Sequence, residues 1–519
     1  MLDTKGLGEI CPGDLAVVSE GRGRARVERG LGSASRIENV LEALLVEQGA
    51  RVELEPYELP SASIEDRVDL RGLPAITIDP ETAKDFDDAL SFRREAGGIR
   101  AWVHIADVSW FVPAGSPLDH GAAERALSTY IPGLVAPMLP HELADDACSL
   151  RPFQDRLCVT VEIPPDGEPL FYRSVINSRA RLTYGEAERR DAAPEILEQL
   201  ELAAELASAL RTERFRRGAL EIASPEIVFS FADGRVESAR REGEPHAHML
   251  VEELMIRANE LVAAFLAGRR RPALYRVHER PDPQSITRLL AQLADLEVPS
   301  PPVPDRLSPQ QAGELAGEIS RRVAEYVEQS GRGREAFPAL LLRSLKQARY
   351  DPANLGHSGL ASPAYCHFTS PIRRYPDVVV HRALVYELGL GDDAVPDDLD
   401  ELAEHTSVLE REAAALEYLA DDICLGWLLE DRLLDEGWDT PWEGEITGAI
   451  GSGLFVRFGE VFEGLLPARR LQGEFYELNS TATALVGRRS GRRYRLGDPI
   501  IVRVESIARS EGKVELALP

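Results

Sequence analysis

Four aspartates within ten residues are the clearest chemical feature of this chain. Asp79, Asp85, Asp87 and Asp88 lie in "AITIDPETAKDFDDALSF", residues 75–92, between the short apolar runs "AITI" and "ALSF". Carboxylates this close repel one another strongly when they are buried, unless a cation compensates them. Magnesium suits the position, because it prefers oxygen ligands and keeps several of its waters. The spacing therefore predicts a magnesium site, although a solvated acidic loop explains it equally well.

A second stretch, "YCHFTSPIRRYPDVVVHR" at 365–382, has the features of a phosphate site. Pro376 is expected to be the first residue of a helix, which places Arg373 and Arg374 just before the helix N-terminus. Free N–H groups and the helix dipole favour an anion there, and a guanidinium matches a phosphate. The alternative is that Arg373 pairs with a structural carboxylate. Together with the acid cluster, this loop makes metal-assisted phosphodiester hydrolysis the leading chemistry.

The elements that must position these groups mix strands and long helices between residues 66 and 435. "AWVHIADVSWFV" alternates like a strand, whereas 195–218 and 248–268 have the apolar spacing of helices. The stretch 398–437 closes this region as a further helix, and the Pro-rich 297–308 is expected to be a loop.

The two ends of the chain have a different pattern of predicted secondary structure from the region between them. Residues 14–30 predict two short strands, followed by a helix with a capping box from Ser35 to Glu38 and a stop at Gly49. From about 438 onward, short alternating strands with Gly turns predict a small closed barrel, for which the OB fold is the commonest answer.

We therefore expect an α+β multidomain protein with a mixed α/β catalytic domain and an all-β OB-fold barrel at the C-terminus. The predicted units are a small N-terminal module at 1–65, the catalytic domain at 66–437 and the barrel at 438–519. The N-terminal module is expected to be either a remnant of a cold-shock-like domain or a helical or winged replacement for one.

The cysteine pattern and the lengths of the apolar runs indicate the cellular compartment of the protein. The five cysteines are scattered without a CxxC pair, no apolar run approaches the length of a membrane span, and no secretory signal is visible. These features predict a cytoplasmic protein with reduced thiols and without membrane contact, and we expect it to be a monomer.

The net charge of −28 argues against long-range attraction of nucleic acid. A basic channel can nevertheless exist within an acidic shell. Three local stretches are basic, "RFRRG" at 214–218, "GRRRP" at 268–272 and "GRRSGRRYR" at 487–495. Each of them is explained equally well as an ordinary solvated face.

Taken together, the motifs resemble the RNB catalytic domain of the ribonuclease II/ribonuclease R family. "TIDPETAKDFDDAL" resembles the metal-site signature of that family, with all four aspartates at its spacing. Further matching stretches follow in the family's order over 66–435: "VHIADVSWFVPAGSPLD", "STYIPGLVAPMLPHELADDACSLRP", "SRARLTYGEAE", "LVEELMIRANE", "YRVHERPDP" and "HFTSPIRRYPDVVVHR".

The resemblance implies a 3′-to-5′ exoribonuclease that degrades single-stranded RNA to nucleoside 5′-monophosphates and leaves a short end product. It implies that the four aspartates bind one or two Mg²⁺ ions, for which Mn²⁺ substitutes, and that Arg373 holds the scissile phosphate. It also implies a catalytic glutamate near the leaving group, Glu417, and a set of RNA-binding residues: Tyr130, Tyr184, Glu253, Arg374 and Phe455.

Several positions remain open at this stage. Without the family context, Tyr130 and Tyr184 are better explained as core aromatics. Phe458 is a second candidate for stacking in the barrel, beside Phe455, and His246 and His248 form an H-x-H that we assign to the surface. Two other functions are consistent with the chain: an RNA-binding regulator without catalysis, and a deoxyribonuclease or endonuclease.

Overall fold

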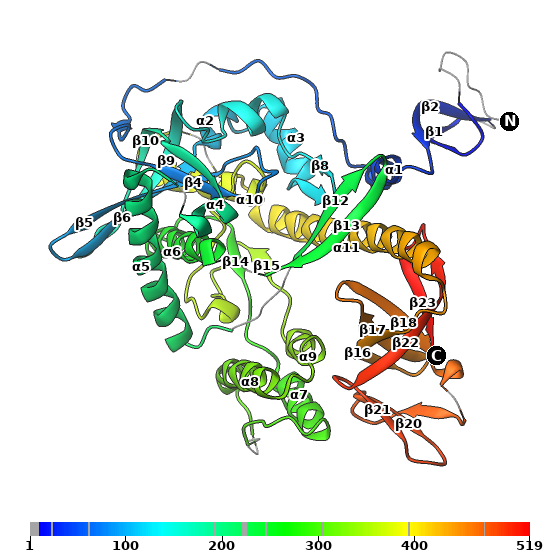
Figure 1. The fold of residues 1–519 in the computed structure, drawn as a ribbon. Coiled ribbons are helices and arrows are strands. Elements are labelled where there is room, and N and C mark those ends of the chain that lie inside the picture. Colours follow the sequence, from blue (N-terminus) through cyan, green and yellow to red (C-terminus); the bar gives the residue numbers. More distant parts are fainter. Residues whose placement is uncertain are drawn as a thin grey trace.

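The computed structural model describes residues 10–21, 24–60, 63–190, 192–220, 226–243, 246–302, 306–392, 395–471 and 473–519. They form a mixed α/β body and a β-rich C-terminal region, joined by one long helix (Figure 1). This arrangement confirms the predicted fold class.

A seven-stranded mixed sheet is the centre of the body, with the strand order β11-β4-β5-β6-β9-β10-β3. Its strands, in that order, are Ala180–Thr183, Ile76–Asp79, Asp88–Glu95, Gly98–Ala106, Asp155–Ile163, Leu170–Asn177 and Val68–Asp69. β11 runs parallel to β4, and β5 runs antiparallel to it. The C-terminal ends of β4 and β11 and the N-terminal end of β5 therefore meet at one end of the sheet.

Helices cover both faces of this sheet. On one face, α5 (Pro194–Arg216) and α6 (His246–Gly268) bury a core that includes Ile76, Leu90, Val103, Leu200 and Leu254. The other face packs against α2 (Val108–Phe111), α3 (Pro117–Arg125) and α10 (Tyr375–Glu387). Both predicted helices, 195–218 and 248–268, are thus confirmed within a few residues.

The small elements around this core form hairpins and a helical group. Two hairpins, β7–β8 and β12–β13, consist of Thr129–Ile131 with Leu134–Ala136 and Glu226–Ala232 with Arg235–Glu242. The strands β14 and β15 (Tyr275–Val277 and Arg349–Asp351) flank the three helices α7, α8 and α9, which are Pro283–Asp295, Pro309–Ser330 and Ala336–Ser344. The short helix α4, Tyr184–Arg189, follows β11 directly.

The described part of the N-terminal module is a hairpin and one helix. β1 (Asp14–Gly21) pairs with β2 (Arg24–Ser33), and α1 (Ile37–Glu47) ends before Gly49, which has a φ of +76°. The predicted capping box is wrong, because Arg36 is the N-cap residue and no side chain caps this helix. The Ser35 backbone N–H instead donates to the Ser33 hydroxyl at 3.2 Å.

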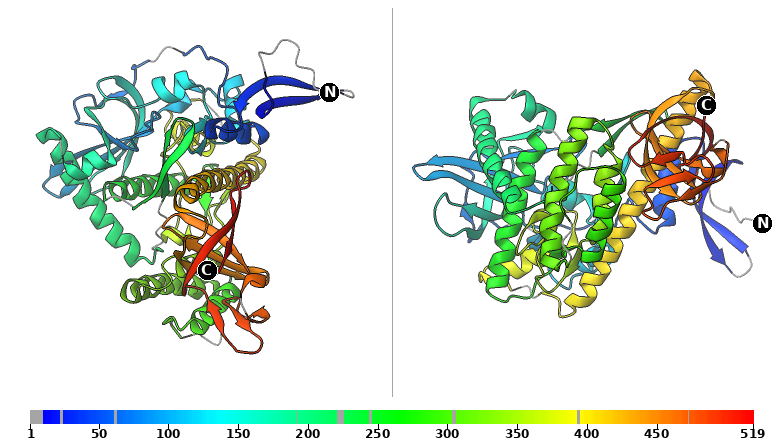
Figure 2. Two further views of the ribbon diagram at one scale, coloured as in Figure 1. Left: turned by 45° about the vertical axis from the view of Figure 1, so that its right-hand side comes forward. Right: turned by 90° about the horizontal axis from the view of Figure 1, so that it is seen from below.

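The C-terminal region contains a closed five-stranded barrel with the order β16-β17-β18-β23-β22, consistent with an OB fold. Its strands, in that order, are Trp442–Ile450, Gly453–Phe458, Phe462–Pro467, Lys513–Ala517 and Pro499–Ala508. A separate sheet of β19, β20 and β21 is inserted after β18: Tyr476–Leu478, Ala484–Gly487 and Arg493–Arg495. The 38-residue helix α11, Leu399–Glu436, runs from the body to the barrel (yellow to orange in Figure 2).

A buried ion pair joins α10 to α3 beneath the sheet. The Arg382 side chain is only 1% exposed and donates to the Asp119 carboxylate at 2.7 Å and to the Val112 carbonyl at 2.7 Å. The Tyr375 hydroxyl donates to the same Asp119 oxygen at 2.8 Å. Removal of one partner leaves an uncompensated charge inside the protein, which costs far more than loss of a surface pair.

We expect Asp119→Ala to lower the free energy of unfolding by about 3–5 kcal/mol, because Arg382 would stay buried without its carboxylate. Chemical denaturation followed by circular dichroism measures this change. The matched control is Glu205→Ala, which removes the exposed partner of Arg94 in a 2.6 Å pair and should cost less than about 1 kcal/mol. Equal effects of the two substitutions would contradict this account.

Candidate active site

The end of the sheet where β4, β5 and β11 meet brings three of the predicted residues together. Asp79 is the last residue of β4, Asp88 is the first residue of β5, and Thr183, whose register partner is Asp79, directly precedes Tyr184. Asp85 and Asp87 lie in the connection between β4 and β5. The pairing of these strands, rather than the loop itself, therefore determines where the acidic groups lie.

Asp87 is the most deeply buried of the four aspartates, at 5% exposed. It faces residues 369–374, the segment before α10, which we call the phosphate loop because a phosphate site is predicted there. The Ile372 backbone N–H donates to its Oδ1 atom at 2.8 Å, and Nε of Arg373 lies 3.7 Å from its Oδ2 atom. The two motifs singled out in the sequence are thus in direct contact, although 285 residues separate Asp87 from Ile372. The Arg373 side chain remains 44% exposed, so part of its guanidinium is available to a ligand.

The phosphate loop is fixed by its own carboxylate and by a neighbouring segment. Asp377 accepts hydrogen bonds at 2.8 Å from the Ser370 N–H and from the Arg374 guanidinium. The Arg373 carbonyl accepts from the Ser128 N–H at 2.9 Å, and the Ala126 carbonyl accepts from the Tyr375 N–H at 2.8 Å. Both arginines precede α10, as predicted, but the helix begins at Tyr375, one residue before Pro376.

Burial makes three of the aspartates costly to ionise. It raises the pKa of Asp79 to about 8, with a further contribution from the charge of Asp88. Burial also raises the pKa of Asp88 to about 7 and holds that of Asp87 well above its usual range, although the Arg373 guanidinium lowers both. A solvated acidic loop is therefore wrong for Asp87, which is 5% exposed, whereas Asp79 and Asp88 are half-buried beside it.

The donors suit a hard divalent cation in their chemistry. They are all carboxylate oxygens, and Oδ2 of Asp79 is buried without a hydrogen-bond partner. A cation with a preference for oxygen ligands would compensate this charge. As the side chains are placed, however, no three His, Cys, Asp or Glu residues within the described part of the chain are arranged to hold a metal ion. The residues thus fit a metal by donor type and burial, without a preformed coordination shell.

Tyr130 connects the aspartates to α11. Its hydroxyl donates to Oδ2 of Asp85 at 2.5 Å, and its backbone N–H donates to Oε1 of Glu417 at 3.1 Å. The residue is 37% exposed, so the alternative of a core aromatic is wrong for Tyr130. Burial raises the pKa of Glu417, and the hydrogen bond from Tyr130 opposes that shift. Glu417 is therefore part of the same group of side chains.

Tyr184 lies at the edge of this group and is half-buried. Its ring contacts the His248 ring edge-on, with centroids 5.5 Å apart, and it also packs against the core between the sheet and the helices α5 and α6. Burial raises its pKa, and the charges of Asp88 and Asp79 add to this effect. Tyr184 thus contributes both to the core and to the rim of the site.

Two predicted RNA contacts do not fit the structure. Glu253 is 1% exposed, and Arg214 donates to both of its carboxylate oxygens, at 2.5 and 3.0 Å. It is therefore a buried partner of α5 with no surface for RNA. Arg374, the residue after Arg373, forms an ion pair with Asp377, and its side chain is only 19% exposed. This pair stabilises the loop before α10.

The two candidate stacking residues of the barrel differ in exposure, because Phe455 is exposed and Phe458 is buried. Phe455 lies on β17 at 36% exposed and is not among the acidic groups at the sheet end. Phe458 is 2% exposed and packs against Trp442 and Phe462, so the prediction of stacking for Phe458 is wrong.

Two residues near the site, Arg181 and His248, were not predicted to belong to it. Arg181 on β11 donates to the Pro80 and Glu81 carbonyls at 2.5 and 3.0 Å, and its guanidinium lies 5.5 Å from the centre of the Phe86 ring. It braces the loop that carries the aspartates. His248 contacts Tyr184, so it is more than a surface residue. The parallel pairing of β4 with β11 would have revealed Arg181, but no local pattern in the sequence indicates that pairing.

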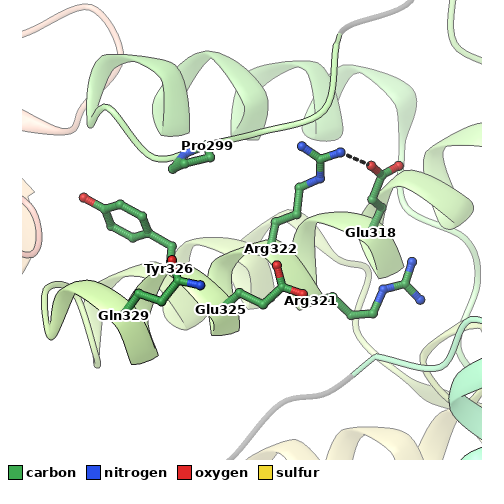
Figure 3. A pocket seen from close by; sticks show the side chains of 7 residues that line it. All are labelled: Pro299, Glu318, Arg321, Arg322, Glu325, Tyr326 and Gln329. Carbon is green, nitrogen blue, oxygen red and sulfur yellow. Dashed lines mark hydrogen bonds and ion pairs between the residues drawn. The ribbon is translucent and has the colours of Figure 1, made fainter.

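A shallow cavity of about 470 Å³ lies elsewhere, on α8 and the segment before it (Figure 3). Its lining is Pro299, Glu318, Arg321, Arg322, Glu325, Tyr326 and Gln329. The charges of the lining balance, Arg322 is paired with Glu318 at 2.7 Å, and none of the predicted site residues is among them.

Comparison with known proteins agrees with the site. The model of the RNB domain matches residues 67–388. Ribonuclease R of Escherichia coli is 37% identical over 492 residues, which are 89% of this chain and 58% of that protein. The chain thus spans somewhat more than half the length of this curated relative.

Solved structures lead to the same group of proteins. The apo form of RNase R from Mycoplasma genitalium superposes with a TM-score of 0.87 at 26% identity, over 96% of this chain and 80% of that one. The same enzyme in complex with ribose-methylated single-stranded RNA gives a TM-score of 0.86 at 26% identity, over the same shares of the two chains. With the family model covering more than half of its residues, and with the acidic sheet end facing the arginine loop, this chain belongs to the RNB domain family.

Proposed function

We propose that the protein is a hydrolytic 3′-to-5′ exoribonuclease that degrades single-stranded RNA to nucleoside 5′-monophosphates and leaves a short end product. The observation that carries this proposal is the contact between Asp87 and the Ile372–Arg373 loop, which brings an acidic group and an exposed arginine together at one end of the sheet. The 37% identity to a protein named Ribonuclease R supports it.

The proposed roles follow from the charges. Asp79, Asp85, Asp87 and Asp88 would hold Mg²⁺, or Mn²⁺ in its place. When bound, such an ion lowers the pKa of water and stabilises the attacking and leaving oxygens. Arg373 has an exposed guanidinium beside the acids and would bind the scissile phosphate. Glu417, with its raised pKa, is suited to hold a proton near the leaving group.

The aromatic groups would position the terminal nucleotides. Tyr130 is half-exposed and held at both its backbone and its hydroxyl, so its ring is oriented before RNA arrives. A fixed aromatic ring can stack on any base, which suits a nuclease without sequence preference. Tyr184, which directly follows the register partner of Asp79, would contact the last nucleotide, and Phe455 would stack on RNA at the barrel.

We further propose that the units 1–65, 66–437 and 438–519 form an N-terminal module, a catalytic domain and an RNA-binding barrel, and that the protein acts as a cytoplasmic monomer. Among the described residues, no helix is both long and apolar enough to cross a membrane.

A second candidate function is an RNA-binding regulator without catalysis. It is favoured by one observation, namely the closed C-terminal barrel, a fold that binds nucleic acid without catalysing its hydrolysis. All four aspartates are present and Arg373 faces them, which favours the nuclease. Incubation of 5′-labelled RNA with the protein and Mg²⁺ separates the two: a ladder that shortens from the 3′ end supports the nuclease, whereas a gel shift without shortening supports the regulator. Mononucleotide products from RNA, but not from DNA, distinguish it from a deoxyribonuclease or an endonuclease.

We expect Asp87→Asn to reduce the rate of RNA hydrolysis by about 100-fold or more, as does loss of a single preorganised polar group in other active sites. Binding of RNA should persist, because asparagine keeps an oxygen for the Ile372 N–H. Single-turnover hydrolysis and filter binding of the same RNA measure the two effects. Asp439→Asn, an exposed acid-to-amide change on the linker to the barrel, is the matched control and should leave both unchanged.

We expect Tyr130→Ala to lengthen the final product by at least one nucleotide, because the shortest RNAs depend most on a stacking contact worth about 1–3 kcal/mol. Tyr130→Phe keeps the ring and should leave the product length unchanged. Denaturing gels of the end products measure this. Tyr386→Ala, which removes an exposed ring at the end of α10, serves as the control. Identical end products of Tyr130→Ala and the wild type would refute the stacking role.

We expect Asp88→Asn to raise the free energy of unfolding by about 1–3 kcal/mol at pH 8.5 in the presence of a chelator, because it removes a carboxylate whose burial outweighs the attraction of Arg373. Added Mg²⁺ should stabilise the wild type and reverse this order, since the variant lacks a proposed ligand. Thermal unfolding with EDTA and with Mg²⁺ tests both statements. A wild type that is more stable than the variant in EDTA would show that the acids are already compensated.

A further inference from the structure

The sheet of β19, β20 and β21 ends in an arginine-rich tip outside the barrel. Residues 474–495 contain five arginines and two glutamates, in a chain with a net charge of −28. Arg488, Arg489 and Arg492 lie in the β20–β21 connection, and all three are exposed. We call these three residues, together with Phe475, the arginine tip.

The base of this sheet is anchored to α7, which separates structural arginines from available ones. Asp295 accepts two hydrogen bonds from Arg493, at 2.8 and 2.9 Å, and one from Asn479 at 2.8 Å. Arg495 pairs with Asp498 at 3.1 Å and with Glu297 at 3.2 Å. Arg493 and Arg495 therefore hold the sheet in place, and the tip projects from a fixed base.

Backbone hydrogen bonds, not guanidinium groups, occupy the nearest carboxylate. Glu474 accepts from the N–H groups of Arg489 and Ser490 at 2.5 and 3.1 Å. Gly487 leaves room for this contact, because a Cβ at that position would lie 2.6 Å from the Glu474 carboxylate. Among the described residues, no carboxylate forms an ion pair with Arg489 or Arg492, whereas Arg488 pairs with Glu477. The fold thus fixes the backbone of the tip and leaves two guanidinium groups available.

Aromatic rings lie beside these guanidinium groups. Phe475 is 65% exposed, and the Arg488 guanidinium lies 5.0 Å from the centre of its ring. Arg492 lies 4.8 Å from the centre of the Tyr494 ring, which is only 8% exposed and therefore supports the guanidinium from below. Exposed arginines beside the open ring of Phe475 are a combination that binds single-stranded nucleic acid, through phosphates and base stacking together.

We propose that the arginine tip is a second RNA-binding surface, which holds single-stranded substrate RNA upstream of the 3′ end being degraded. The proposal rests on the proposed function for the identity of the substrate. The tip is separate from Phe455 on β17, and the views of Figures 1 and 2 place it and the acidic end of the sheet in opposite parts of the molecule. A long RNA can reach both surfaces, and a short RNA held at the acids contacts only one.

The test compares RNAs of six and thirty nucleotides in full-length protein that carries Asp87→Asn, so that the RNA stays intact. We expect the triple variant Arg488→Ala, Arg489→Ala and Arg492→Ala to weaken binding of the long RNA about tenfold. The slope of log K against log salt should fall by about 1.4, since two of the three arginines have no carboxylate partner and each phosphate contact to a single strand contributes about 0.7. Affinity for the short RNA should not change. Phe475→Leu should weaken binding of the long RNA without altering the salt slope.

The matched control removes three exposed arginines elsewhere, as Arg94→Ala, Arg190→Ala and Arg270→Ala, and changes the net charge equally. The proposal is overturned if the tip variant binds the long RNA as the control does, or if it loses affinity for both RNAs to the same degree. It is also overturned if polyglutamate competes for the tip as strongly as RNA does and Phe475→Leu has no effect. A wild type that binds long RNA through the tip but never hydrolyses it would refute the proposed function and leave this surface intact.

Discussion

Mutual repulsion among buried carboxylates is the constraint on which this structure depends. Asp79, Asp87 and Asp88 lie where the ends of β4 and β5 meet, and burial raises the pKa of each. A folded chain tolerates such a group only where other contacts hold it in place. Here those contacts are the β4–β11 pairing, the brace from Arg181 and the hydrogen bond from Ile372. Carboxylates with raised pKa values, held together by a rigid sheet, are typical of a functional site.

The loop opposite the acids shows how one positive group is kept available. Two adjacent arginines precede α10, but Asp377 engages only Arg374. Arg373 is left half-exposed, at 3.7 Å from Asp87. The segment 126–128 hydrogen-bonds to the same loop and then continues into β7, which carries Tyr130. Acid, arginine and aromatic ring are thus connected through short hydrogen-bonded contacts.

Much of this arrangement could be predicted from the sequence, because its signals are local. The Pro at the start of α10 and the apolar spacing of α5 and α6 each depend on a short stretch, and the structure agrees with them. The aspartate spacing is also local, and the magnesium site that it indicates stays a prediction. Glu253 and Arg374 were assigned to RNA, but their partners, Arg214 and Asp377, fix them in the interior. Such pairing depends on tertiary contacts that no local pattern reveals. The same limit applies to Arg181, whose role follows from a parallel strand pair about 100 residues apart in sequence.

The helix α11 has a mechanical consequence for the whole molecule. Its 38 residues form a rod of about 57 Å, and Glu417, which receives the Tyr130 N–H, lies near its middle. Asp422 and Trp427, a few residues further along α11, contact the C-terminal barrel. Gly512 packs so tightly on Asp422 that a Cβ at position 512 would lie 2.5 Å from it, and the Arg509 guanidinium lies 3.7 Å from the centre of the Trp427 ring. The barrel is clamped to this rod rather than tethered by a flexible linker. Under the proposed function, tension along an RNA bound by the barrel would therefore act directly on the helix that accepts the Tyr130 N–H.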